Sequence, residues 1–270
     1  MALTAFQRDI CRSLAETRLR LGESYVAGGA ALNELLAAPR ISRDVDLFHD
    51  TDEALAVSWQ ADRLSLEREG CTLAIVRERP TYVEAEVRRG RDVLVLQWTR
   101  DSAYRFFPLV QHPDLGLALH PFDLATNKVL ALVGRLEPRD FIDTLSCDRL
   151  VQPLGYLAWA ASGKDPGFSP AAILEQAARG ARYSQDELAG LDFESEKPDA
   201  ASLSRQWHQA LDTARVVVSR LPAAEAGRAV LDRSGRLFTG RPEELRDAVT
   251  AGALLYHAGR IRGALPVVVR

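Results

Sequence analysis

A pair of glycines near the amino terminus constrains this chain more than any other feature. Gly28 and Gly29 follow a short apolar run at residues 24–27 and precede a helix-like run that ends at Ala38. Glycines let the backbone approach a ligand closely, and the start of a helix binds anions through its free N–H groups. The turn therefore predicts a phosphate-binding site.

Two aspartates separated by one residue, Asp44 and Asp46, follow in an otherwise apolar extended segment. Successive side chains of a strand point to opposite faces, so both carboxylates share one face and Val45 and Leu47 the other. Adjacent like charges repel, and Mg²⁺, which takes oxygen ligands and substrate phosphates, offsets that repulsion. An isolated Asp-x-Asp is more often two solvated acids; the glycine turn upstream is what favours a metal and nucleotide site.

Composition and charge exclude several classes of function. The 270 residues are 47% hydrophobic and 26% charged, which is typical of globular proteins with one large domain or two ordinary ones. No apolar run approaches the ~20 residues that span a bilayer, and residues 1–21 do not resemble a signal peptide, so we expect a cytoplasmic protein without a membrane partner. A net charge of −3 argues against non-specific duplex binding, although a local arginine patch could still hold structured RNA.

Apolar periodicity and Gly/Pro punctuation predict an α+β fold. Helices are expected over residues 3–21 and from 51 to Gly70, with strands at 71–77, 82–88 and 92–99. Two more helices follow, at 124–136 and from 137. The expected later helices lie at 153–162, 170–181, 185–191, 202–221 and 242–262, with a small hairpin at 230–238. The prediction is a core at residues 1–150 and a mainly helical domain at 151–270.

The motifs, taken in order, resemble a known superfamily. The segment Gly28-Gly29-Ala30-Ala31-Leu32 with Arg40-x-Ser42-x-Asp44-x-Asp46-Leu47 resembles the Gly-Gly/Asp-x-Asp signature of the DNA polymerase β-like nucleotidyltransferases. Residues 125–132, followed by Arg135 and residues 139–143, resemble the AbiEii/AbiGii-type toxin branch. This resemblance implies a polymerase β-like nucleotidyltransferase core, with a mixed sheet and flanking helices, followed by an all-helical C-terminal region.

The resemblance also implies a role for each matching residue. Asp44 and Asp46 would hold Mg²⁺ and act in catalysis, and Lys128 would contact the triphosphate of an NTP substrate. Asp140, with Asp143, matches the last acidic motif and is assigned to catalysis. The residues assigned to nucleotide binding are Gly28, Gly29, Ser42, Arg43 and Lys128.

Lys128, Asp140 and Asp143 can also be explained by ordinary helix structure, without a role in catalysis. Lys128 could be an ordinary helix-surface cation, but it is the only lysine among the first 150 residues of a chain with 34 basic residues. Asp140 lies two residues after a proline, as is common at a helix start, and Asp143 lies one helical turn further on. That spacing puts the two acids on one face whether or not they act in catalysis.

The chain departs from the superfamily pattern at the third carboxylate. Polymerase β-like enzymes usually place another acid on a later strand, and here the best-matching position is Gln97. Glu84 and Glu86 alternate on the preceding strand and could replace it, although they also fit an ordinary solvated face.

Three functions are consistent with these residues. The first is a Mg²⁺-dependent nucleotidyltransferase that moves an NMP from an NTP to an acceptor hydroxyl, which the resemblance implies to be a toxin acting on tRNA or another cellular target, with a cognate antitoxin as partner. The second is a small-molecule nucleotidyltransferase of the antibiotic-modifying kind. The third, motivated by Gln97, is a non-catalytic nucleotide-binding module.

Overall fold

The structure, a computed structural model, describes residues 3–180 and 182–268. The chain divides into two compact units, residues 1–103 with 108–120, and residues 104–107 with 121–270. The division at residue 150 that the sequence suggests stays a prediction. Helices α4 (Pro121–Arg135) and α5 (Pro138–Leu150) fall in the second unit because they pack against α6 (Leu154–Ala161).

A seven-stranded mixed sheet forms the centre of the first unit. Its strand order is β4-β5-β6-β3-β1-β9-β8. The β3–β6 and β1–β9 pairs are parallel, whereas the other pairs are antiparallel. The strands are β1 (Ser24–Ala27), β3 (Asp44–His49), β4 (Thr72–Arg79), β5 (Tyr82–Arg89), β6 (Asp92–Arg100), β8 (Val110–His112) and β9 (Gly116–Ala118), and a short β2 (Arg40–Ile41) precedes β3. The expected strands 71–77, 82–88 and 92–99 are therefore confirmed as β4, β5 and β6.

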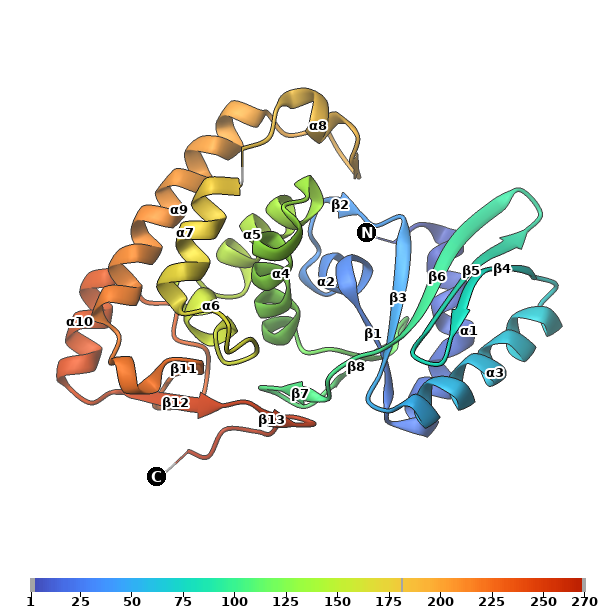
Figure 1. The fold of residues 1–270 in the computed structure, drawn as a ribbon, viewed down its shortest axis with the longest axis horizontal. Helices are drawn as coiled ribbons and strands as arrows, with labels where there is room; N and C mark the ends of the chain where they lie inside the picture. The colour runs from blue at the N-terminus through green and yellow to red at the C-terminus, as the bar shows by residue number, and fades with distance from the viewer. Residues whose placement is uncertain (1–2, 181, 269–270) are drawn as a thin grey trace. The chain divides into compact units, whose positions relative to one another are not determined.

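Helices α1 (Ala5–Leu21) and α3 (Asp52–Arg68) pack against each other and against the same face of this sheet (Figure 1). Each helix begins at a threonine that caps its first turn: Thr4 Oγ1 accepts from the N–H of Gln7, and Thr51 Oγ1 from that of Ala54. The third helix, α2 (Gly28–Leu36), starts directly at the end of β1 and contacts β1 and β3.

Burial alternates along the middle of the central strands. Over residues 44–49 of β3, 82–87 of β5 and 94–99 of β6 every second side chain is buried, and the largest of these is Trp98, which is fully buried. The intervening side chains are half-exposed, and they include Asp44 and Asp46. We call this half-exposed face of β3, β6 and β5 the site face. One face of the sheet thus builds the core, and the other carries the polar residues that the sequence singled out.

A buried ion pair lies within that core. The guanidinium of Arg18 on α1 pairs with the carboxylate of Asp62 on α3, and both side chains are fully buried. Asp62 also accepts hydrogen bonds from Trp98 Nε1 at 2.8 Å and from Ser58 Oγ at 3.3 Å. Charges in a low-dielectric interior are stable only with such partners. Since the partners come from α1, α3 and β6, the cluster joins both helices to β6.

His49, at the end of β3, is buried beside this cluster. Its Nδ1 lies 3.3 Å from the carbonyl oxygen of Thr99, and its Nε2 lies 3.1 Å from Ser24 Oγ. A carbonyl can only accept, so Nδ1 carries the proton and Nε2 accepts from the hydroxyl. Burial, with a contribution from the charge of Arg18, lowers the pKa of His49 to about 3. The ring is therefore a neutral part of the core.

The second unit is mainly helical. Its remaining helices are α7 (Pro170–Gly180), α8 (Gln185–Ala189), α9 (Ala200–Arg220) and α10 (Pro242–Thr250), with a 3₁₀ turn η1 (Ala223–Glu225). Its short strands are β7 (Tyr104–Arg105), β10 (Asp192–Phe193), β11 (Arg228–Asp232), β12 (Leu254–Ala258) and β13 (Arg260–Ile261). The hairpin expected at 230–238 closes, because the N–H of Phe238 donates to the carbonyl of Val230 at 3.0 Å.

The helix expected over residues 242–262 was wrong in its second half. Helix α10 ends at Thr250, and Gly252 adopts a left-handed φ of +56° that turns the chain out of the helix. Strand β12 then pairs antiparallel with β11. Leu254 and Tyr256, two residues apart on that strand, both pack against a core cluster formed by α6, α9, β11 and α10. That pairing requires an extended backbone, which a helix cannot supply.

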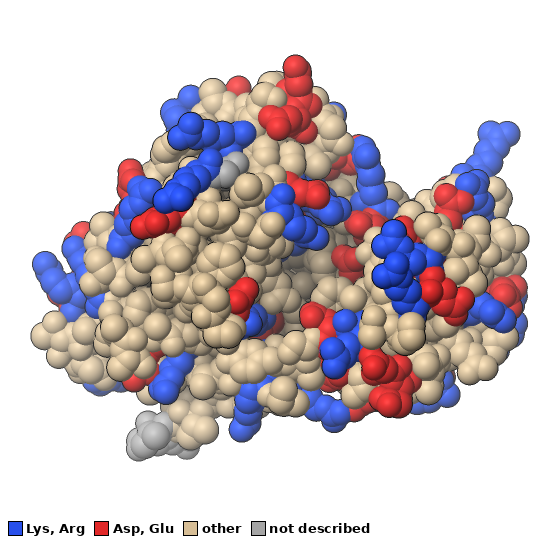
Figure 2. All heavy atoms as spheres, viewed as in Figure 1, with Lys and Arg blue, Asp and Glu red and all other residues tan. Residues whose placement is uncertain are grey.

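None of the helices within the described ranges is both long and apolar enough to cross a membrane. On the face of the molecule drawn in Figure 2, basic and acidic side chains lie side by side over both units.

Candidate active site

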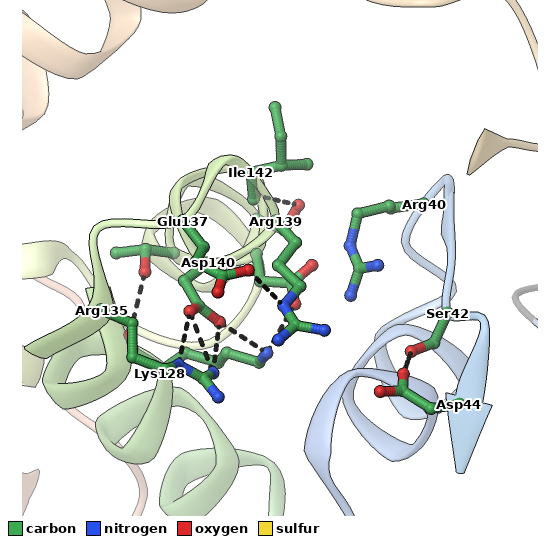
Figure 3. Close-up of polar contacts among 12 residues, drawn as sticks. Arg40, Ser42, Asp44, Lys128, Arg135, Glu137, Arg139, Asp140 and Ile142 are labelled. Atoms are coloured by element: carbon green, nitrogen blue, oxygen red, sulfur yellow. Dashed lines mark hydrogen bonds and ion pairs between the residues drawn. The ribbon is translucent and has the colours of Figure 1, made fainter. Parts of the chain in front are cut away.

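The two aspartates of β3 lie on the site face, next to each other on the same strand. Asp44 and Asp46 are half-buried, whereas Val45 and Leu47 between and after them are buried in the core. The hydroxyl of Ser42, itself buried, donates a 3.0 Å hydrogen bond to Asp44 Oδ1 (Figure 3). Ser42 thus fixes one carboxylate of the pair.

The glycine turn lies directly against the second carboxylate. Gly28 adopts a left-handed φ of +64°, and a Cβ added there would overlap the Oδ2 of Asp46 and lie 2.7 Å from its Cγ. Only glycine combines that backbone conformation with such a close carboxylate. The register agrees, since Asp46 is the strand partner of Ala27, the residue before the turn. The glycine pair and the aspartate pair therefore form one site.

Arg40 and Ser42 converge on the second glycine. A Cβ on Gly29 would lie 2.5 Å from Arg40 Nη2 and 3.0 Å from Ser42 Oγ. Arg40 is 4% exposed, and helix α2 begins without a side-chain cap on its N-terminal N–H groups. A buried guanidinium, a hydroxyl and a helix start together suit a phosphate. Arg40 was not assigned a binding role from the sequence; its placement two residues before Ser42 on the same face was the available signal.

Arg43 is placed differently from its neighbours. Its side chain is exposed, between buried Ser42 and half-buried Asp44. The assignment of Arg43 to nucleotide binding stays a prediction.

Gln97 occupies the position expected for the third acid. In the parallel β3–β6 pair it lies opposite Asp46, and in the antiparallel β5–β6 pair it lies opposite Glu84. Residues at one register share a face, so a single row across the site face reads Asp46, Gln97, Glu84. Within residues 3–180 and 182–268, no three or more His, Cys, Asp or Glu side chains come together to hold a metal ion.

The two glutamates of β5 have other contacts. Glu84 accepts a 2.8 Å hydrogen bond from the hydroxyl of Tyr82, and Glu86 pairs with Arg88. Burial, with the Glu84 hydrogen bond, raises the pKa of Tyr82 to about 12, so this phenol stays protonated at neutral pH.

These residues fit a magnesium ion bound together with a substrate. Mg²⁺ is commonly held by only one or two carboxylates, with water and substrate phosphates as its other ligands. Asp44 and Asp46 supply two carboxylates on one face, and the α2 start next to Asp46 suits phosphates. Gln97 adds a neutral oxygen but no charge, so the protein's own ligand set is weak without a nucleotide.

In the second unit, Lys128 on α4 is held by two acids of α5. Its Nζ lies 3.0 Å from Asp140 Oδ1 and 3.0 Å from Asp143 Oδ2, and both aspartates are fully buried (Figure 3). The acids lie one turn apart on α5, whose first turn begins at Pro138, so they face α4 together. Arg135 binds the outer side of Asp140, with Nε at 3.1 Å from Oδ2 and Nη2 at 3.0 Å from Oδ1.

In this arrangement Asp140 is the ion-pair partner of Lys128 and Arg135. Both of its oxygens receive cationic donors, one from Lys128 and two from Arg135. The Arg135 side chain is 50% exposed, so the cluster has a cationic outer surface. Asp140 thus positions two cations rather than presenting a free carboxylate, and Arg135 is the member that the sequence did not assign to the site.

Comparison with protein-family profiles gives no match, and no curated protein is significantly similar in sequence. Among solved structures, a candidate nucleotidyltransferase from Helicobacter pylori superposes with a TM-score of 0.51 and 15% identity, over 81% of this chain and 97% of that chain. JHP933 from Helicobacter pylori gives 0.50 and 12%, over 79% and 90%. MenT4, a nucleotidyltransferase toxin from Mycobacterium tuberculosis, gives 0.49 and 15%, over 89% and 91%.

At these identities the likeness concerns the fold. The chain has a nucleotidyltransferase fold, with a mixed seven-stranded sheet and flanking helices. The fold class predicted from the sequence is confirmed, and the likeness agrees with the superfamily resemblance of its motifs.

Proposed function

We propose that the chain is a Mg²⁺-dependent nucleotidyltransferase that moves an NMP from an NTP to an acceptor hydroxyl. One observation carries the proposal. On a nucleotidyltransferase fold, the Asp46 carboxylate lies against Gly28 at the start of α2, beside the Ser42–Asp44 pair. The same strand end therefore brings together oxygen ligands for a metal and donors for phosphate.

The residues of the first unit would have distinct tasks. Asp44 and Asp46 would hold Mg²⁺, which when bound neutralises charge on the phosphate oxygens. The N–H groups that open α2, with Arg40, would bind phosphates and orient the NTP. The acceptor hydroxyl would then attack the α-phosphorus and release its proton to solvent, the bond between the α-phosphorus and the oxygen bridging to the β-phosphorus would break, and pyrophosphate would leave.

In the second unit, Lys128 is proposed as a triphosphate contact on the strength of the sequence resemblance. Asp140 and Asp143 would keep its ammonium in one place, and Arg135 would add a second cation. A lysine held by two buried carboxylates loses little further freedom when it binds a phosphate.

The neutral side chain of Gln97 affects how tightly the protein alone would bind Mg²⁺. With two acids instead of three, we propose that Mg²⁺ binds mainly as a complex with the NTP, and that turnover is slow. Replacement of Gln97 by Glu would then raise the affinity for Mn²⁺ without nucleotide, as measured by calorimetry.

Labelled nucleotides test the proposal. The protein is incubated with each α-labelled NTP, Mg²⁺ and either total tRNA or cell lysate. Label transfer by the unaltered chain and loss of transfer by Asp44→Ala are expected. Absence of transfer to any acceptor, or equal transfer by Asp44→Ala, would reject the proposal.

A toxin role is proposed from the sequence resemblance, with tRNA or another cellular target as acceptor, a cognate antitoxin as partner and the cytoplasm as the place of action. Expression should arrest growth, whereas expression of Asp46→Asn should not. Arrest by both variants would show that growth inhibition is independent of this site.

Because Gln97 stands in place of the third acid, a second candidate function is a nucleotide-binding module without turnover. That function predicts NTP binding by calorimetry with no pyrophosphate release. A small-molecule nucleotidyltransferase would instead place label on a small molecule and none on RNA.

A further inference from the structure

The outer part of the site face, beyond Gln97, carries an aromatic ring and two arginines. The row that begins with Asp46 continues through Gln97 and Glu84 to Arg77 on the edge strand β4. The neighbouring row holds Tyr82 on β5 and Arg79 on β4, which are strand partners. We call Arg77, Arg79 and Tyr82 the outer strip.

A β-bulge in β4 is what places both arginines on the site face. Ile75 pairs with Ala85 and Arg77 pairs with Glu84, so Val76 is the extra residue between them. In a regular ladder Val76 would face Glu84, and Arg77 and Arg79 would point to the opposite face. A one-residue insertion reverses the faces of all later residues, and bulges often re-aim side chains next to active sites.

Arg77 has Glu84 as its strand partner, but neither Arg77 nor Arg79 forms an ion pair with a carboxylate among the residues that the structure describes. Both side chains are exposed, and the recorded contact of Arg77 is with the Tyr82 ring, whose centroid lies 5.8 Å from its Cζ. By contrast, Arg88 on the adjacent strand is paired with Glu86. Unpaired guanidiniums beside an aromatic ring combine phosphate binding with a surface for stacking.

We propose that the outer strip binds the single-stranded end of an RNA that presents the acceptor hydroxyl. Base stacking on the Tyr82 ring and phosphate contacts from Arg77 and Arg79 are the two elements by which proteins hold single strands without reading their sequence. Three strand spacings separate β3 from β4, roughly 14 Å, which a short single-stranded end can cross while its terminal hydroxyl reaches Asp46. This inference rests on the proposed function and assigns the surface that would hold its acceptor.

The protein's total charge is compatible with such a local site. A net charge of −3 disfavours broad electrostatic attraction to duplexes, and Figure 2 shows acidic side chains next to basic ones on its face. Two guanidiniums without ion pairs and a ring on one strand pair would instead favour a single strand over a duplex, because only unpaired bases expose a face for stacking.

RNA binding without NTP tests the outer strip. Fluorescence anisotropy is measured with a fluorescein-labelled single-stranded oligoribonucleotide, and with the matching duplex, over a series of salt concentrations. Arg77→Ala/Arg79→Ala should weaken single-strand binding at least ten-fold and reduce the log–log salt slope by about 1.4, from two phosphates at ~0.7 each. Tyr82→Leu should weaken binding about ten-fold and leave that slope unchanged.

Matched variants separate this inference from the proposed function. Arg77→Lys/Arg79→Lys should keep the salt slope, and Arg63→Ala, an exposed arginine on α3, should bind RNA as the unaltered chain does. Equal RNA binding by the double alanine variant, or binding of the duplex in preference to the single strand, overturns the inference. The outer-strip variants should bind NTP as tightly as the unaltered chain does, as measured by calorimetry. Failure of the unaltered chain itself to bind NTP would count against the proposed function and not against this inference.

Discussion

Replacing Gly28 by alanine tests the geometry that joins the glycine turn to the aspartates. Two costs follow from the structure. The left-handed φ of +64° costs an alanine about 1–2 kcal/mol of folding free energy. In addition, the new Cβ would overlap Asp46 Oδ2 and lie 2.7 Å from Asp46 Cγ, where ordinary contact needs 3.4 Å, so the carboxylate must retreat by more than about 0.7 Å. Ligand distances at a metal hold to about ±0.2 Å.

Gly90 provides a matched control for this variant. It has the same φ of +64°, it lies in the turn between β5 and β6, and a Cβ there would meet nothing within 4 Å. Gly90→Ala should therefore lose the same backbone energy as Gly28→Ala without moving a carboxylate.

Denaturant unfolding and calorimetric titration with Mg²⁺ and NTP give the two readouts. Both variants should lower the free energy of unfolding by at least ~1 kcal/mol. Gly28→Ala should lower it further and weaken nucleotide binding at least ten-fold, whereas Gly90→Ala should bind normally. Equal unfolding and equal nucleotide binding by the two variants would refute the contact between Gly28 and Asp46.

Three further predictions concern stability. Arg18→Met leaves Asp62 as a buried charge without its partner and should lower the free energy of unfolding by about 3–5 kcal/mol, measured by urea denaturation. Burial and the charge of Arg18 lower the pKa of His49 to about 3 from an ordinary 6.5, so between these values the unfolded chain binds a proton that the folded chain does not. This contribution to stability is complete above pH 6.5 and falls as the pH falls, by about 2 kcal/mol at pH 5, and His49→Gln should remove that part of the pH dependence. Asp140→Asn should destabilise by about 1–3 kcal/mol, whereas Arg135→Gln, at a half-exposed side chain, should change stability by less than about 1 kcal/mol.

Each of these expectations has a contradicting result. Arg18→Met with unchanged stability would mean that Asp62 finds other compensation. Parallel stability curves for His49→Gln and the unaltered chain between pH 4 and 7 would show that His49 does not control the acid limb. Equal losses of unfolding free energy for Asp140→Asn and Arg135→Gln would mean that the stabilisation by this cluster comes from the half-exposed Arg135–Asp140 pair.

The local signals in the sequence were sufficient for three strands of the first unit. Strands β4, β5 and β6 follow from alternation and from the breaks at Pro80 and Gly90. The superfamily pattern put Gln97 at the position of the third acid, and the structure places Gln97 opposite Asp46 in the β3–β6 pair.

Long-range pairing could not be predicted in the same way. Residues 254–258 contain apolar residues that suit a helix or a strand, and the choice depends on pairing with β11 and on packing with α6 and α9. The bulge at Val76 has no signature in the sequence, so the arginines that follow it could not be assigned to a face. Arg135, although part of the motif, was not assigned to the site, because its relation to Asp140 depends on the turn between two helices.

A comparison of α-labelled with γ-labelled NTP tests the central claim most directly. The unaltered chain, given the acceptor found in the nucleotide screen, should transfer label from the α-position and none from the γ-position, with release of pyrophosphate. Asp46→Asn should abolish both transfer and release. Transfer of the γ-label, or undiminished α-transfer by Asp46→Asn, would contradict the assignment of nucleotidyl transfer to this site.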